Sequence, residues 1–248
     1  MKRKQIYLLV LMIVAVVGIG GYAAFDRFVG NNVDIESVMA PIEETAGGGE
    51  TAEAAGATEA GAEATDTAAA TVAPEDVNGQ WSIADGSKVY WSVTTSKETV
   101  NFVNEAVTGA WTVDLNDAAA MTGEGVLDMT ALQSGNGTRD DHVKTREDLL
   151  DTATYPQATF KAATFSALPA EWIEGTALPL QITGILVVKG KEKEVTFDSE
   201  AMYRDGQLLL SGKTKVTFAD FGMTSPHTVV LETENELTVQ LELVLNKA

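Results

Sequence analysis

The chain has 248 residues, a formal net charge of −19 at neutral pH and no cysteine. A chain this acidic is not expected to bind nucleic acid, because binding to a phosphate backbone needs a basic face that displaces counterions. The lack of cysteine excludes disulfides, a thiolate nucleophile and Cys-based metal sites, and it removes the lipid-accepting cysteine of a bacterial lipoprotein. Any membrane anchor must therefore be peptide.

The first element along the chain is an uncharged apolar segment at residues 5–25, which follows the basic residues 2–4. At about 1.5 Å rise per residue, a helix of this length spans a hydrocarbon core of roughly 30 Å. Residues 1–26 are therefore expected to form a single-pass transmembrane helix, with its basic flank in the cytoplasm and the remaining chain on the extracytoplasmic side. The alternative is a signal peptide cleaved near Ala23 and Ala24, which would also export the domain.

Residues 27–76 are expected to form a low-complexity linker. From 41 to 76 the sequence is nearly all Ala, Gly, Thr and Glu, without Lys, Arg or an aromatic residue. Such a stretch cannot bury enough apolar surface to offset the entropy cost of ordering it. We expect a disordered, self-repelling acidic spacer that holds the folded part away from the bilayer.

From residue 77 to residue 248, short segments alternate between apolar and polar side chains, which is typical of half-buried antiparallel strands. Strands are expected around residues 89–93, 107–113, 125–129, 182–188, 195–197, 208–218 and 237–245. About eight such strands with one helical interruption favour a closed antiparallel barrel or a sandwich over an α/β fold. Glycines inside these strands indicate bends, bulges or the close approach of a ligand, at positions 109, 125, 184 and 212.

The helical interruption is expected at residues 140–154, and it opens in a polar cluster of Arg139, Asp140, Asp141 and His142. A carboxylate that orients His142 is half of a general-base arrangement, and two aspartates with a histidine could hold a divalent ion. Because the sequence completes neither design, we predict no catalytic residue, no metal and no cofactor. Asp140 or Asp141 is instead expected to accept hydrogen bonds from free N–H groups at the helix start, and Arg139 to pair with a carboxylate.

Residues 139–142, followed by Tyr155-Pro156 and by residues 158–160, resemble the YceI signature, in which Arg-Asp-x-His opens the helix and Tyr-Pro-x-Ala-x-Phe enters the next strand. Further segments that resemble this family occur in the same order at 81–83, 182–190 and 218–223. The resemblance implies that residues 77–248 form an extended, eight-stranded, lipocalin-like barrel whose interior accommodates an isoprenoid chain, such as a polyprenyl or quinone tail. The chain departs from the family in its apparent anchor, its acidic spacer and the turn at 190–193, which lacks the usual threonine.

The inward apolar side chains either fill the barrel or surround a slender ligand, and the resemblance favours the ligand. The expected ligand-binding residues of the interior and mouth are Trp91, Trp111, Leu127, Met129, His142, Phe160, Leu186, Phe197, Leu210, Phe218 and Leu241. We therefore predict a binding protein, not an enzyme, that sequesters or transports a long apolar isoprenoid-type lipid. The alternatives are an enzyme that modifies a lipid head group and a solid-core surface scaffold. The expected partners are the lipid and the membrane, and homodimerisation stays open.

Overall fold

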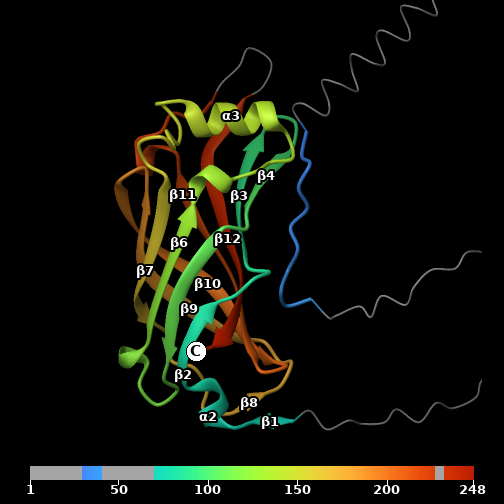
Figure 1. The fold of residues 1–248 in the computed structure, drawn as a ribbon, viewed down its shortest axis with the longest axis vertical. Coiled ribbons are helices and arrows are strands. Elements are labelled where there is room, and N and C mark those ends of the chain that lie inside the picture. Colours follow the sequence, from blue (N-terminus) through green and yellow to red (C-terminus); the bar gives the residue numbers. More distant parts are fainter. Residues whose placement is uncertain (1–29, 41–69, 227–231) are drawn as a thin grey trace, which may run out of the picture.

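The computed structural model describes residues 30–40, 70–226 and 232–248. Within these ranges the chain forms a closed antiparallel β-barrel with one helix, α3, lying across one end (Figure 1). The expected all-β barrel is thereby confirmed. Its elements are β1 (Thr71–Val72), α2 (Pro74–Val77), β2 (Gly79–Ile83), β3 (Lys88–Thr95), β4 (Thr99–Asn104), β5 (Val107–Val113), β6 (Thr122–Asp128), α3 (Gly137–Thr145), β7 (Gln157–Phe165), β8 (Trp172–Ile173), β9 (Leu178–Val188), β10 (Lys191–Arg204), β11 (Gln207–Thr217) and β12 (Thr233–Lys247).

Among the described residues, eight strands close the barrel in the order β11-β10-β9-β7-β6-β5-β2-β12, because β12 also pairs with β11. Strand β12 is long enough to pair with two strands on its other edge. Its residues 233–242 lie beside β3, and its last residues lie beside β2. Strand β4 pairs with β3, and its Val103 also bridges to Gln133 in the loop before α3. The wall nearest α3 therefore contains β12, β3 and β4.

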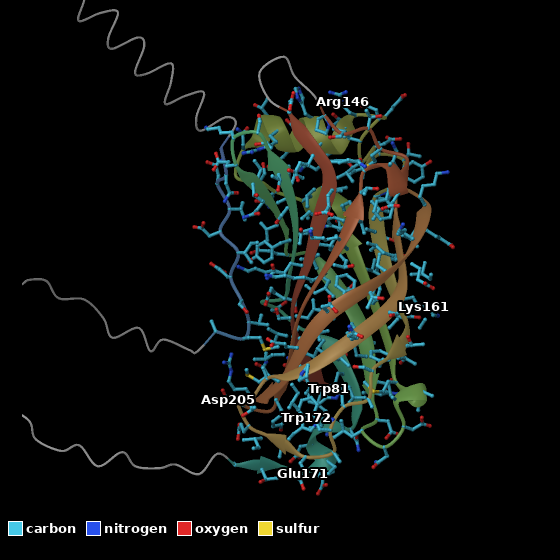
Figure 2. All side chains as sticks on the ribbon, turned by 180° about the vertical axis from the view of Figure 1, so that it is seen from behind. Trp81, Arg146, Lys161, Glu171, Trp172 and Asp205 are labelled. Atoms are coloured by element: carbon cyan, nitrogen blue, oxygen red, sulfur yellow. The ribbon has the colours of Figure 1, made fainter. Side chains whose placement is uncertain are left out.

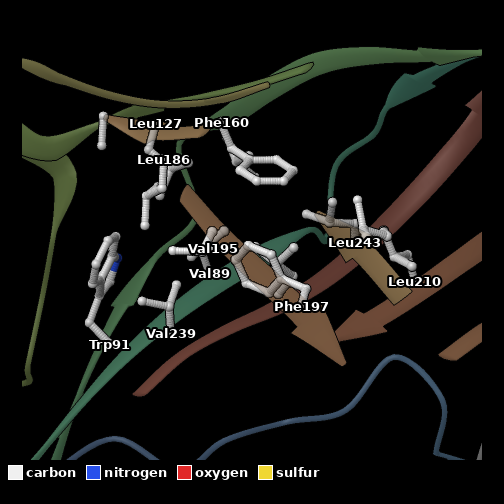
Figure 3. Close-up of a cluster of buried hydrophobic side chains, with 14 of the residues drawn as sticks. Val89, Trp91, Leu127, Phe160, Leu186, Val195, Phe197, Leu210, Val239 and Leu243 are labelled. Atoms are coloured by element: carbon white, nitrogen blue, oxygen red, sulfur yellow. The ribbon is translucent and has the colours of Figure 1, made fainter. Parts of the chain in front are cut away.

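The apolar residues of the strands point inward with the period of two that the sequence predicts. On β12, the five alternate residues from Leu237 to Leu245 are all buried, and Leu243 pairs with Leu210 of β11. In the middle of the barrel, side chains from facing strands meet (Figure 3), and the rings of Phe160 and Phe197 pack edge to face with centroids 5.2 Å apart. This part of the interior is a packed core.

Helix α3 begins earlier and ends earlier than the expected span of 140–154. The side chain of Asn136 caps its start by accepting a hydrogen bond from the backbone N–H three residues later. After Thr145 the chain turns, and Leu149 and Leu150 are buried from this turn. These leucines produced the helical periodicity, but tertiary burial holds them in a turn.

Two parts of the expected linker 27–76 contact the barrel. Residues 30–40 run along its outside from the α3 end towards the other end (Figure 1). Residues 71–77 form β1, which pairs with β8, and α2, whose Val77 is fully buried. The folded part therefore extends beyond the expected limit at 77. The expected transmembrane segment 1–26 and the linker residues 27–29 and 41–69 lie outside the described residues. Among the residues that the structure does describe, no helix is long and apolar enough to cross a bilayer.

Three glycines expected inside strands, at positions 109, 184 and 212, allow neighbouring strands to approach closely. A Cβ at Gly109 on β5 would overlap the carbonyl oxygen of Glu124 on β6. A Cβ at Gly184 would overlap the carbonyl oxygen of Lys161 on β7, and a Cβ at Gly212 would overlap the side chain of Ser199 on β10. At Gly125, by contrast, no atom lies within 4 Å of the position that a Cβ would take. The close approach at 109, 184 and 212 therefore comes from adjacent strands.

Candidate functional site

The barrel contains a cavity of about 660 Å³ at its α3 end. Strands β3, β4 and β12 form one side of it, and α3 with the turn that follows forms another. Its apolar lining consists of Trp91, Val93, Val100, Phe102, Met129, Leu132, Val143, Leu149, Leu150, Val188, Phe218, Met223, Pro226 and Leu237. The charged side chains of Arg139, Arg146 and Asp148 also border the cavity. The site is thus an apolar space with a polar border.

The predicted site residues divide into two groups by height along the barrel axis. Four of them line this cavity, namely Trp91, Met129, His142 and Phe218. The other seven are buried in the barrel interior outside it, namely Trp111, Leu127, Phe160, Leu186, Phe197, Leu210 and Leu241. Side-chain alternation indicates the face of a strand but not the height at which a cavity opens. Their contact with a ligand stays a prediction.

The sequence reasoning missed much of the apolar lining. Val100 and Phe102 come from β4, which was not among the expected strands although apolar and polar residues alternate along it. Leu149 and Leu150 were assigned to a helix, and they reach the cavity from the turn after α3. The alternation in β4 was a signal that could have been used, whereas the turn depends on tertiary packing.

Arg139 links the cavity border to neighbouring segments. Its Nε donates to the Ser134 hydroxyl oxygen at 3.0 Å, its Nη2 donates to the carbonyl oxygen of Gly30 at 3.0 Å, and its guanidinium carbon lies 6.0 Å from the ring centroid of Phe102. These contacts are with neutral groups, so the expected pairing with a carboxylate is not what positions this side chain. Partial burial lowers the pKa of Arg139, partly offset by the nearby charge of Asp140.

Asp140 has a structural role that differs from the expected helix cap. Its buried carboxylate accepts hydrogen bonds from the backbone N–H and the hydroxyl of Ser134, at 2.8 and 2.5 Å. The cap itself is Asn136, so the expectation that Asp140 or Asp141 satisfies the N–H groups at the helix start is wrong. Asp140 instead fixes the loop before α3 to the helix.

His142 lies at the exposed surface of α3, beside the cavity. Within the described ranges, no group of three His, Asp or Glu side chains comes together in a way that could hold a metal ion. The carboxylate of Asp140 is engaged by Ser134, so Asp140 is not free to orient His142.

Two ion pairs hold the segments around this end of the barrel. Arg146 donates to both carboxylate oxygens of Asp148, at 2.8 and 2.5 Å, and thereby lowers the pKa of Asp148. Asp220 accepts from Lys193 Nζ at 2.7 Å and from the Thr217 N–H at 2.8 Å, and chiefly the lysine holds the pKa of Asp220 below its usual range. The Arg146–Asp148 pair is about half exposed and so contributes little to stability by itself. The side chain of Asp220 is only 20% exposed, and it also binds a backbone N–H.

One polar group inside the cavity wall has no partner among the described residues. The indole N–H of Trp91 is buried and makes no hydrogen bond within them. The N–H of Trp111 is also buried and unpaired there, but Trp111 does not line the cavity. The ring of Trp91 therefore lines the cavity, while its N–H is enclosed by protein.

The chain is similar to a known family and to several solved structures. A family model for the YceI-like domain matches residues 81–245. BcnA of Burkholderia cenocepacia is 22% identical, with a TM-score of 0.56 over 65% of this chain and 98% of that one. A polyisoprenoid binding domain from Saccharophagus degradans, implicated in plant cell wall breakdown, is 13% identical, with a TM-score of 0.54 over 68% and 98%.

A YceI protein of Campylobacter jejuni is 20% identical, with a TM-score of 0.50 over 60% of this chain and 85% of that one. At such identities, the likeness to these structures establishes a shared fold. No curated protein matches the sequence. Since the family model covers more than half of the chain, and since the barrel observed is the one these structures share, the chain belongs to the YceI-like domain family.

Proposed function

We propose that this protein is an exported, membrane-tethered binding protein that carries a long isoprenoid-type lipid, such as a polyprenyl or quinone-like molecule. The observation that carries the proposal is the cavity of about 660 Å³ with its apolar lining. Its size falls within the range typical of small-molecule sites, and such sites combine apolar walls with a few polar groups. The name of the Saccharophagus degradans relative, a polyisoprenoid binding domain, supports the isoprenoid class.

Burial of the lipid chain supplies the binding free energy. About ten buried methylenes at roughly 0.8 kcal/mol each give a gross gain near 8 kcal/mol. Ordering of the lipid and of the cavity wall subtracts from that gain, and a micromolar Kd requires about 8 kcal/mol net. A somewhat longer chain therefore binds with micromolar affinity without an ion pair.

The ring of Trp91 lines the cavity, and a turn of this ring would let its unpaired N–H donate to an oxygen atom of the lipid. A buried donor without a partner costs about 1–3 kcal/mol, and a prenol hydroxyl or a quinone carbonyl can accept from it. A pure hydrocarbon would leave this donor unpaired. Oxygen-bearing isoprenoids are therefore the preferred ligand class.

The two alternative functions have less support. Chemistry on a lipid head group would need His142 to be oriented by a carboxylate, whereas Asp140 is engaged by Ser134. A solid scaffold would have a filled interior, which the cavity at the α3 end argues against.

The membrane part of the proposal rests on the uncharged run at 5–25 and on the basic residues 2–4. Protease added to intact spheroplasts is expected to cut the chain within residues 41–69. Protection in intact spheroplasts, with cleavage only after lysis, would overturn the exported orientation.

The lipid proposal is tested on the full chain extracted from membranes in mild detergent. Native mass spectrometry is expected to detect one apolar molecule per chain, and lipid extraction should identify it as an isoprenoid with an oxygen-bearing end. A chain that is consistently empty, or that carries only bilayer phospholipid in non-stoichiometric amounts, would contradict the proposal.

A further inference from the structure

The outer surface of the barrel has a strip of polar side chains that is shielded from solvent. Tyr90 on β3, Asn101 on β4, and Gln240 and Glu242 on β12 alternate with inward core residues and so face outward. They are nevertheless at most 9% exposed, and Glu242 is 0% exposed. Residues 30–40, which we call the strap, lie over this strip (blue in Figure 1).

The first half of the strap is bound through its backbone and through one asparagine side chain. Asn101 donates its backbone N–H to Asn31 Oδ1 at 2.9 Å, and its Nδ2 donates to the carbonyl oxygen of Val33 at 2.9 Å. The hydroxyl oxygen of Tyr90 accepts from the N–H of Glu36 at 3.2 Å. Backbone groups of the strap thus meet polar side chains of the barrel one after another.

The second half of the strap is held by a buried carboxylate and an arginine. Glu242 Oε2 accepts from the N–H of Val38 at 2.9 Å and from the hydroxyl of Ser37 at 3.3 Å. Arg204 donates to the carbonyl oxygens of Val38 and Ala40 at 2.9 and 3.0 Å. A fully buried carboxylate needs hydrogen-bond donors, and the strap supplies two of those that Glu242 uses.

The strap begins at the border of the cavity. The carbonyl oxygen of Gly30 accepts from Arg139 of α3, and Arg139 borders the cavity. A Cβ at Gly135, in the loop before α3, would come within 2.8 Å of Asn32. The strap ends at Arg204, next to the labelled Asp205 at the end of the barrel opposite Arg146 (Figure 2). Its course therefore runs from the α3 end, where the cavity lies, to the far end.

This course starts at the α3 end of the barrel, so only a short stretch of chain separates that end from the N-terminal apolar run. Phe25, the last residue of that run, is five residues before Gly30, and five residues of extended chain span at most about 18 Å. A free linker of the expected length, 27–76, would instead give a root-mean-square separation of about 35–40 Å. Docking of the strap therefore replaces a long tether with a short one.

We propose that the strap holds the α3 end of the barrel, which contains the cavity, towards the bilayer, so that an apolar lipid passes directly between membrane and cavity. This inference rests on the proposed function, because it requires residues 1–26 to be the anchor and the cavity to hold lipid. It changes the role of the linker, since the tether is the short segment before Gly30 and not the acidic spacer.

The two ends of the acidic stretch 41–69 agree with this orientation. Ala40, before it, is bound by Arg204, and the carbonyl oxygen of Ala70, after it, accepts from the N–H of Glu174 at 2.9 Å. Both contacts lie at the end of the barrel away from α3. The acidic stretch therefore starts and returns at the end of the barrel that the proposal turns away from the bilayer.

The orientation is measured with a fluorophore on a single introduced cysteine, since the chain has none of its own. The full chain carries either Thr138→Cys on α3 or Glu171→Cys at the far end (Figure 2), both at exposed positions. It is placed in phosphatidylcholine vesicles that contain a quencher-labelled lipid. Strand β12, with 15 residues, rises by about 50 Å along its length, so the two labels lie at clearly different heights. The label at 138 should be quenched several-fold more strongly; equal or reversed quenching would overturn the proposal.

The role of the strap is tested by Asn101→Ala combined with Arg204→Ala, which removes side-chain contacts near both of its ends. The quenching ratio between the two labels should fall towards one, while the thermal unfolding temperature shows that the barrel remains folded. The matched control combines Lys161→Ala with Lys215→Ala, which removes two exposed ion pairs away from the strap and should keep the wild-type ratio. If the first double variant does not fold, Val38→Pro removes a strap N–H without changing the barrel. An unchanged ratio in the folded strap variant would overturn the proposal.

Two further readouts separate failure of this inference from failure of the proposed function. A chain that does not float with the vesicles lacks the anchor, and a floating chain without extractable isoprenoid lacks the ligand. A floating, lipid-loaded chain with equal quenching at both labels contradicts the orientation alone.

Discussion

Two valines on β3 provide the sharpest test of the cavity. Val93 lines it, whereas Val89, four residues earlier on the same inward face, lies in the packed core (Figure 3) and is 1% exposed. Val89→Phe must displace its neighbours and should cost about 1–3 kcal/mol of unfolding free energy. For a domain of this size that corresponds to a fall of roughly 2–12 °C in Tm. Val93→Phe should change stability by less than about 1 kcal/mol, because the larger side chain enters empty space and buries apolar surface there.

The two valine variants should also differ in their affinity for the lipid. If the Val93→Phe ring takes the place of about three methylenes of the lipid, the gross loss is about 2.4 kcal/mol, or roughly 50-fold in Kd. Val89→Phe should leave the Kd almost unchanged. Thermal unfolding of lipid-free protein and titration with a polyprenol, both in the same detergent, measure the two effects. Equal destabilisation by both variants, with unchanged lipid affinity at Val93→Phe, would refute the assignment of the cavity.

Three further predictions concern hydrogen bonding, packing and pH. Trp91→Phe should weaken binding of a prenol about 2- to 12-fold, which is the contribution of one hydrogen bond. The control Trp111→Phe should leave the affinity unchanged. Equal effects of the two variants in the titration would remove the argument for an oxygen-bearing ligand. Gly184→Ala should lower the free energy of unfolding in urea by about 1–3 kcal/mol, because its Cβ meets backbone atoms of β7. Gly125→Ala should not lower it. Similar losses of unfolding free energy in both variants would show that strand contact is not the cause. The pKa of Asp220 lies below its ordinary value of 3.8, so its contribution to stability is present above about pH 3.9 and lost as the pH falls through the lowered pKa. Urea unfolding should accordingly show the gap between wild type and Asp220→Asn closing in acid, and a gap of constant size would contradict the contribution of the ion pair.

The face of each strand could be predicted from the sequence because it follows from a period of two. The buried alternate residues from Leu237 to Leu245 illustrate this. The end of α3 could not be predicted, because Leu149 and Leu150 satisfy helical periodicity while burial at the barrel end holds them in a turn. Local pattern and tertiary packing favour different structures there, and packing prevails.

The position of the cavity and the presence of the strap were beyond sequence reasoning for a different reason. Leu186 and Val188 share a strand and a face, yet only Val188 lines the cavity. Val38 of the strap donates its N–H to Glu242, which lies 204 residues further along the chain. In the alternation of β12, Glu242 reads as an ordinary solvent-facing residue, and nothing local indicates that residues 30–40 cover it.

The measurement that tests the central claim most directly is titration of the delipidated full chain with a defined polyprenol, followed by native mass spectrometry. The account predicts saturation at one lipid per chain for wild type and for Val89→Phe, and strongly reduced occupancy for Val93→Phe at the same lipid concentration. Binding of several lipids without saturation, or equal occupancy in all three proteins, would contradict the claim that the cavity at the α3 end holds the ligand.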